Sequence, residues 1–167
     1  MVLGLETRLE AWGDHRDLIN KRMADNYLSD AKSILVEAKA ARRRKHHHRA
    51  IRLSQESFEL SLKAILRSIG VEYPKEHEVS DAIEENVAKF PDWFQSKVTY
   101  LEDASVWLSE RRGPSMYGDE IAGKPASKLF TSEDSRKALE YADKALKFAK
   151  KLLSEIFGVK SYYTGPS

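Results

Sequence analysis

The segment from about Arg49 to Ile69 constrains the fold most, because it carries apolar residues on two sides of one helix. The two stripes, each at helical spacing, are Ile51, Phe58, Leu62, Ile65 and Ile69 on one side and Ala50, Leu53, Leu60 and Ala64 on another. A helix that is apolar on more than one side is buried against several neighbours at once. We therefore expect this segment to be the central helix of the core, ended by Gly70 in the left-handed conformation.

Helical spacing of apolar residues recurs before and after this segment. A helix is predicted over about residues 17–41, and half of its stripe is alanine, which lets a neighbouring helix approach closely. A shorter stripe before Gly13 predicts a helical lead, either an accessory helix or the start of the next one. The last helix is expected to begin at Thr131 or Ser132 and to end at Gly158. In chain order, the three stripes are Val2, Leu5, Leu9 and Trp12; Ala24, Tyr27, Ala31, Ile34, Ala38 and Ala41; and Ala138, Tyr141, Ala145, Phe148, Leu152 and Ile156.

The middle of the chain reads as a loop over residues 71–80, a short helix over 81–89, and a longer helix that Pro91 opens and that stops near Gly113 and Pro114. Residues 118–130 have the composition of a loop. No segment shows the two-residue period of a strand. The pattern predicts an all-α, up-and-down antiparallel bundle of four to five helices. We divide the chain into an N-terminal helical extension (1–16), the bundle (17–158) and a C-terminal tail (159–167).

Composition narrows the class of protein. The 167 residues are 41% hydrophobic and 32% charged, which is typical of one folded domain. The chain has no cysteine, which excludes disulfides and thiolate metal sites and fits a reducing compartment. No apolar run approaches the roughly 20 residues of a membrane span, and the first ten residues lack the order of a signal peptide. We expect a soluble, cytoplasmic protein with no membrane partner.

Charge is concentrated in one short run. The net charge is only +2, but residues 42–49 read Arg-Arg-Arg-Lys-His-His-His-Arg. Consecutive histidines on a helix point about 100° apart, so His46, His47 and His48 are not expected to share a metal ion. The run is either solvated surface or a contact for a polyanion. No Gly-rich phosphate loop or nucleophile elbow is present, and no cofactor or metal is expected.

A second charged stretch interrupts the helical pattern. Arg111 and Arg112 are followed by Gly113 and Pro114, then by Tyr117, Asp119 and Glu120 in the order Tyr-Gly-Asp-Glu. Two guanidinium groups can hold a phosphate through paired hydrogen bonds. Groups of this kind bind or cleave phosphodiesters, but they also cap helices and pair with each other on ordinary surfaces.

The central helix resembles the signature helix of HEPN domains. The pattern A-x4-Q-x3-E-x3-K-A-x-L is matched by Ala50, Gln55, Glu59, Lys63, Ala64 and Leu66. The loop, the next helix, the arginine-rich turn and the final Ala- and Tyr-rich helix follow in the HEPN order, so that the resemblance covers about residues 17–157. It implies a helical bundle that is usually a homodimer. Many HEPN proteins are metal-independent RNases that act as toxins, often paired with a small nucleotidyltransferase.

The resemblance also implies a cleavage motif, R-x4–6-H, in a basic groove between two subunits. Here Tyr117 stands where the histidine would be, counted from either Arg111 or Arg112. An unperturbed tyrosine is ionised to only about one part in a thousand at pH 7, which makes it a poor general base. Some HEPN toxins carry a tyrosine two places later that the partner modifies, and here that place is Asp119.

These observations favour a binding and regulatory protein, the HEPN half of a two-protein nucleotidyltransferase system. Nucleotide or RNA phosphate would be bound, near the dimer interface, by Arg43, Arg44, Arg49, Arg111 and Arg112 with Asp119 and Glu120. The main alternative is a metal-independent endoribonuclease that uses Arg112 and Tyr117, or a histidine of the 46–48 run from the other subunit. A third is a non-catalytic structural dimer whose Arg/Tyr/Asp cluster pairs internally.

Overall fold

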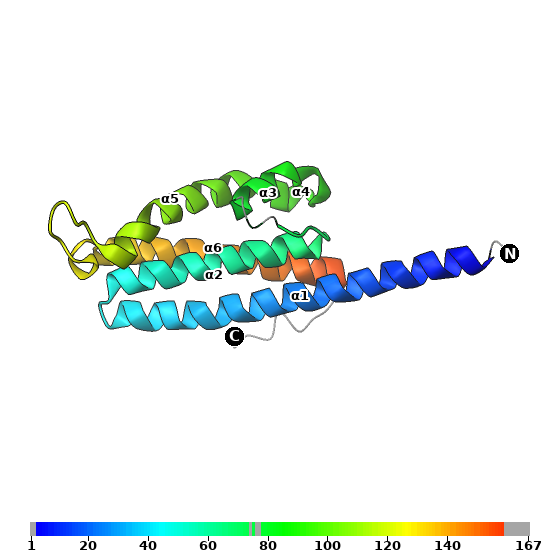
Figure 1. Ribbon diagram of the computed structural model, residues 1–167, viewed down its shortest axis with the longest axis horizontal. Coiled ribbons are helices and arrows are strands. Elements are labelled where there is room, and N and C mark those ends of the chain that lie inside the picture. The colour runs from blue at the N-terminus through cyan, green and yellow to red at the C-terminus, as the bar shows by residue number, and fades with distance from the viewer. Residues whose placement is uncertain (1–2, 74, 76–77, 159–167) are drawn as a thin grey trace.

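The computed structural model describes residues 3–73, 75 and 78–158, with side chains from residue 13 onward, and its long helices alternate in direction (Figure 1). The four long helices are α1 (Leu3–Arg43), α2 (His47–Ser68), α5 (Val98–Tyr117) and α6 (Ser132–Phe157). Short helices lie between them: α3 (Val79–Glu85), η1 (Val87–Lys89), α4 (Asp92–Gln95) and η2 (Ala126–Lys128). The predicted all-α, up-and-down antiparallel bundle is confirmed.

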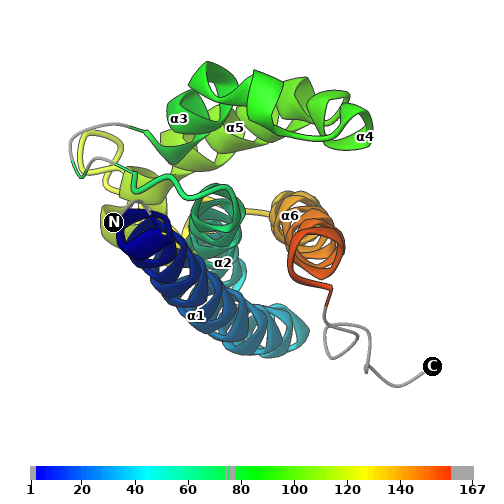
Figure 2. The same cartoon turned by 90° about the vertical axis from the view of Figure 1, so that its right-hand side faces the viewer.

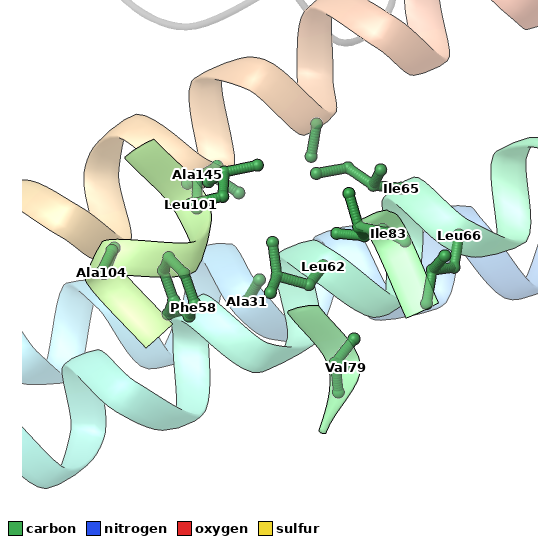
Figure 3. Close-up of a cluster of buried hydrophobic side chains, with 14 of the residues drawn as sticks. Ala31, Phe58, Leu62, Ile65, Leu66, Val79, Ile83, Leu101, Ala104 and Ala145 are labelled. Carbon is green, nitrogen blue, oxygen red and sulfur yellow. The ribbon is translucent and has the colours of Figure 1, made fainter. Parts of the chain in front are cut away.

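Helix α2 is the centre of the bundle, as its two apolar stripes predict. Figure 2 shows it between α1 and α6 on one side and the layer of α3, α4 and α5 on the other, and it contacts α1, α3, α5 and α6. Phe58, Leu62 and Ile65 of α2 are each at most 1% exposed. Figure 3 shows them among side chains from the surrounding helices, including Ala31, Leu101, Ala104 and Ala145.

Helix α1 passes through Gly13 without a break, so that the N-terminal lead continues into the next helix. Its first turns project beyond the bundle, and residues 13–19 are all exposed (Figure 1). Further along, Ala24, Ala31 and Ala38 are fully buried against the bundle. Their small size permits a close approach of the two helices. The approach is seen in a 2.7 Å hydrogen bond that the buried Ser57 hydroxyl of α2 donates to the Ala31 carbonyl of α1.

Helix α5 departs from the sequence prediction at both ends. A separate short helix, α4, follows Pro91, and α5 then runs through Gly113 and Pro114 to Tyr117. Proline removes one backbone N–H and crowds the preceding residue when that residue is helical. Here the preceding residue is glycine, which has no Cβ, and both residues are exposed, so water reaches the carbonyl that loses its partner. The helix ends at Gly118, whose φ is +75°.

Replacing Pro114 with alanine is expected to raise stability, because it restores the hydrogen bond to the Glu110 carbonyl and removes the ring. A proline inside a helix costs about 3 kcal/mol relative to alanine, and its restriction of the unfolded chain returns up to about 1 kcal/mol. We expect a net gain of about 1–2 kcal/mol near this exposed helix end, measured by urea unfolding. A variant that is less stable than the wild type would contradict this prediction, and would show that the proline ring stabilises the end of α5 more than the restored hydrogen bond does.

Helix α6 begins and ends as its sequence predicts. Thr131 forms a capping box with Asp134, in which the Thr131 hydroxyl accepts from the Asp134 N–H and the Asp134 carboxylate accepts from the Thr131 N–H. Gly158 follows the helix with a left-handed φ of +65°. The buried face is centred on alanines and leucines, so the expected burial of Ile156 is wrong: its side chain is 42% exposed.

Aromatic side chains fill the space between α5 and α6. Tyr100 and Trp107 of α5 both lie edge-to-face against Tyr141 of α6, at ring separations of 5.5 and 5.7 Å. Cations cover several rings from the solvent side; the ammonium of Lys144, for example, lies 5.0 Å from the Tyr100 ring centre. The Tyr100 hydroxyl is buried and has no hydrogen-bond partner among the described residues.

Tyr100→Phe is therefore expected to stabilise the protein by about 1 kcal/mol, because it removes a buried polar group that bonds to nothing. The difference in stability between the Tyr100→Phe variant and the wild type should grow at high pH. Burial, with a contribution from Glu140, raises the pKa of Tyr100 to about 12. Between about pH 10 and that value the unfolded tyrosine ionises while the folded one does not, so wild-type stability falls with pH. Denaturant unfolding of both proteins from pH 8 to 11 measures the difference, and a constant difference would contradict the burial of this hydroxyl.

None of the helices within the described residues has a stretch long and apolar enough to span a membrane.

Candidate functional site

The charged segments singled out from the sequence come together at one end of the bundle. Figure 1 shows the α1–α2 turn, the end of α5, the 118–130 loop and the start of α6 at this end. Side chains tie the turn to α6: the Arg42 guanidinium donates to the hydroxyls of Ser132 and Ser135, both at 3.2 Å. The Nδ1 atom of His47 lies 2.9 Å from the same Ser135 hydroxyl. The basic run is thus anchored through Arg42 and His47, and its other cations stay at the surface.

A hollow of about 250 Å³ lies at the basic turn, between α1 and α2. Arg44, His46 and Arg49 line it together with one carboxylate, Glu37. Arg43 lies on the last turn of α1 and is exposed. None of these three arginines forms an ion pair within residues 13–158 for which the structure gives contacts. The hollow therefore carries a net positive charge, as a site for phosphate requires.

Arg111 and Arg112 have different environments, although they are neighbours on α5. The Arg111 guanidinium lies 3.7 Å from the Trp107 ring centre and donates a 2.9 Å hydrogen bond to the Trp107 carbonyl. It faces an open hollow that also contains the carboxylates of Glu110 and Asp134. The Arg112 side chain is exposed, and among the described residues it forms no ion pair or hydrogen bond. Arg112 is the better placed of the two to bind an external anion.

Arg112 lies close to a carboxyl group on the central helix. Burial raises the pKa of Glu59 above its ordinary value, and the positive charges of Arg112 and Lys63 partly offset this effect. The buried amide of Gln55 donates a 3.3 Å hydrogen bond to the same carboxyl group. The polar positions of the signature pattern, Gln55, Glu59 and Lys63, thus follow one another at one-turn intervals in a row along α2, and the charge of Arg112 acts on Glu59 in this row.

Arg52 extends this row toward the basic turn. It precedes Glu59 by seven residues, two helical turns, and so lies on the same side of α2. Its charge contributes, after burial, to lowering the pKa of His48. Neither Arg52 nor Glu59 is among the site residues predicted from the sequence. The seven-residue spacing of these two polar residues is visible in the sequence, but which side of α2 faces Arg112 is not.

Tyr117 does not share a face of α5 with Arg112. Because the helix continues through Pro114, the two residues are five positions apart on one helix, which places them about 140° apart around its axis. The Tyr117 side chain is 72% exposed. Within one protomer this geometry does not place the two side chains against a single phosphate.

The two carboxylates after Tyr117 belong to a tight loop. Asp119 and Lys124 exchange two backbone hydrogen bonds of 2.8 and 2.9 Å, and the Asp119 carboxylate accepts from the Ala122 N–H at 2.9 Å. Glu120 is exposed at the tip of this loop. In the part of the chain that the structure describes, no ion pair joins either arginine of α5 to Asp119 or Glu120. The internal pairing that the structural-dimer alternative requires is therefore not observed there.

The three consecutive histidines face different neighbours. His46 lines the basic hollow, His47 contacts Ser135, and His48 is partly buried near Arg52. Across residues 13–73, 75 and 78–158, no group of three or more histidine, aspartate or glutamate side chains is arranged to hold a metal ion. His77 lies outside the described residues.

The helical order and the signature row point to one family. The family model of the HEPN domain matches residues 24–152, and the chain belongs to this family. Two solved structures share its fold. The crystal structure of TT1696 from Thermus thermophilus is 23% identical, with a TM-score of 0.60 over 77% of this chain and 96% of that one. The crystal structure of ST0689, described as an archaeal HEPN homologue, is 22% identical, with a TM-score of 0.57 over 78% and 97%. No curated protein matches the chain significantly.

Proposed function

We propose that this HEPN-domain protein binds RNA through the phosphate backbone, along a row of cations that runs from the α1–α2 turn to Arg112. The observation that carries the proposal is the lack of compensating charge. Arg43, Arg44, Arg49 and Arg112 have no ion-pair partner among the described residues, whereas Arg136 on α6 is paired with both Glu133 and Glu140. Unpaired arginines at one end of a chain whose net charge is only +2 provide a local positive field.

The spacing of these cations favours a strand over a mononucleotide. Arg49 and Glu59, which lies beside Arg112, are ten residues apart on α2, or about 15 Å along the helix axis. One phosphate cannot reach both ends of this row, whereas several successive phosphates of a strand can. Arg52 lies between the two ends and completes the row.

Binding without cleavage is the favoured activity. Metal-independent RNA cleavage requires a group that removes the proton of the ribose 2′-hydroxyl and a cation that stabilises the phosphate. Tyr117 and Arg112 lie on different sides of α5, so this pair does not supply both functions within one protomer. Incubation of labelled RNA with the protein in EDTA tests the endoribonuclease alternative. If the wild-type protein cleaves the RNA and the Arg112→Ala variant does not, the protein is an endoribonuclease and the proposal of binding without cleavage is wrong.

We propose further that the protein acts as a homodimer and as the HEPN half of a nucleotidyltransferase system. Exposed apolar side chains next to the cations support an interface at this end: Met116 is 43%, Tyr117 72% and Ile121 fully exposed. Light scattering of the purified protein checks the dimer. Co-purification with a nucleotidyltransferase encoded beside it checks the partnership.

Arg112→Ala is expected to weaken the binding of a single-stranded RNA by about five- to tenfold, because one charge-assisted phosphate contact contributes about 1–1.5 kcal/mol. Fluorescence anisotropy with a labelled oligonucleotide measures the affinity. Arg22→Ala is the matched control, since Arg22 is an exposed arginine on α1 far from this end of the bundle. Equal losses in the two variants would mean that only net charge matters and would contradict a site at Arg112.

A further inference from the structure

A second hollow lies on α1 and α2, away from the basic turn. It measures about 240 Å³ and is lined by side chains of Tyr27 on α1, Lys63 and Arg67 on α2, and Glu72 and Tyr73 in the loop that follows. Lys63 and Arg67 are one helical turn apart and so present their charges on the same side of α2. With Lys75, which also lines it, the hollow combines the planar surfaces of two tyrosine rings with the positive charge of three cations.

Arg67 is the group that most needs a ligand. Its side chain is only 13% exposed, and one terminal nitrogen donates a 2.7 Å hydrogen bond to the Glu72 carboxylate. Its Nε–H is buried and has no acceptor among the described residues. Because this nitrogen is not accessible, an anion in the hollow would stabilise Arg67 through the charge of its guanidinium group and not through this N–H.

Lys63 and Tyr73 define the rest of the site. The Lys63 ammonium lies 4.9 Å from the Tyr73 ring centre, so that the cation and the aromatic face are held together. Among the described residues of the lining, Glu72 is the only carboxylate, and it is already paired with Arg67. The described lining of the hollow at the basic turn has cations and the imidazole of His46, but no tyrosine, phenylalanine or tryptophan ring.

From this geometry we infer a separate binding site for a small aromatic anion, a planar ring that carries a phosphate or a carboxylate. The anionic group lies at Arg67 and Lys63, whose side chains line the hollow and carry its positive charge. The ring packs against Tyr27 and Tyr73. The site is distinct from the cation row of the proposed function and approaches it only through Lys63, whose charge acts on Glu59.

Isothermal titration of the protein with AMP, phenyl phosphate, 4-hydroxybenzoate and inorganic phosphate tests the inference. We expect the aromatic anions to bind more tightly than inorganic phosphate. Comparing the affinities of AMP and phenyl phosphate with that of 4-hydroxybenzoate then shows whether the site prefers a phosphate or a carboxylate. Arg67→Gln should weaken the preferred ligand at least about tenfold, because it removes a charge-assisted contact.

Two further variants separate binding from folding. Lys63→Gln should weaken the same ligand, and Tyr73→Leu should weaken the aromatic anions while leaving inorganic phosphate unchanged. Circular dichroism confirms that each variant is folded. Arg112→Ala should bind the aromatic anion as wild type does, whatever its effect on RNA. The inference is overturned if no aromatic anion binds, if inorganic phosphate binds as tightly, if Arg67→Gln and Lys63→Gln retain full affinity, or if Arg112→Ala abolishes binding.

Discussion

Replacing Gly118 with alanine should destabilise the protein by about 3 kcal/mol or more, with a fall in Tm of roughly 6–12 °C. Gly118 has φ +75° and ψ −159°, a region of backbone conformation that only glycine occupies readily. An added Cβ would also overlap the Lys124 carbonyl oxygen and lie 2.8 Å from the Ala126 nitrogen. These are backbone atoms of the loop that closes onto the end of α5, so they cannot rotate away.

Gly123→Ala provides the matched control for this prediction. Gly123 lies in the same loop and also has a positive φ, +66°, but an added Cβ would meet nothing within 4 Å. Only the conformational cost remains, about 1–2 kcal/mol. Urea unfolding compares the two variants. If both lose the same free energy, the close approach of the loop to Gly118 is not a feature of the folded protein.

The sequence predicted the helices whose apolar pattern reflects burial. Two stripes on one segment identified α2 as the central helix, and the alanine stripe of α1 predicted the close approach that the hydrogen bond from Ser57 to Ala31 shows. The end of α5 was not predictable in the same way. Gly113 and Pro114 are general signals for a helix end, but an exposed position with glycine before the proline lowers their cost enough for the helix to continue. The exposure of this position is a tertiary property, which local sequence does not encode.

The candidate site was predicted as a set of residue types, but not as an arrangement. Arg111 and Arg112 are equivalent in sequence, and only the fold shows that Trp107 holds Arg111 while Arg112 is exposed. The expectation that Arg112 and Tyr117 could act together assumed a loop between them. The continuous helix separates them around its axis. Arg52 and Glu59 were missed because their role depends on which side of α2 faces Arg112.

The largest effect on function is expected from removing four arginines together. The variant with Arg43, Arg44, Arg49 and Arg112 all changed to alanine should lose about 100- to 1000-fold in RNA affinity at low salt, because each phosphate contact contributes about 1 kcal/mol. A charge-matched control changes four exposed cations elsewhere, namely Arg16, Arg22, Lys32 and Lys89. It should retain most of the affinity, since the proposed strand follows α2 and does not reach these positions.

The dependence of RNA affinity on salt tests the central claim most directly. Each phosphate neutralised on a single strand contributes about −0.7 to the slope of log K against log salt concentration. Anisotropy titrations at several concentrations of potassium chloride should therefore give a slope that is about 3 units shallower for the four-arginine variant than for wild type. The control variant should keep the wild-type slope. A wild-type slope near zero, or equal slopes for the wild type and the four-arginine variant, would contradict RNA binding along these cations.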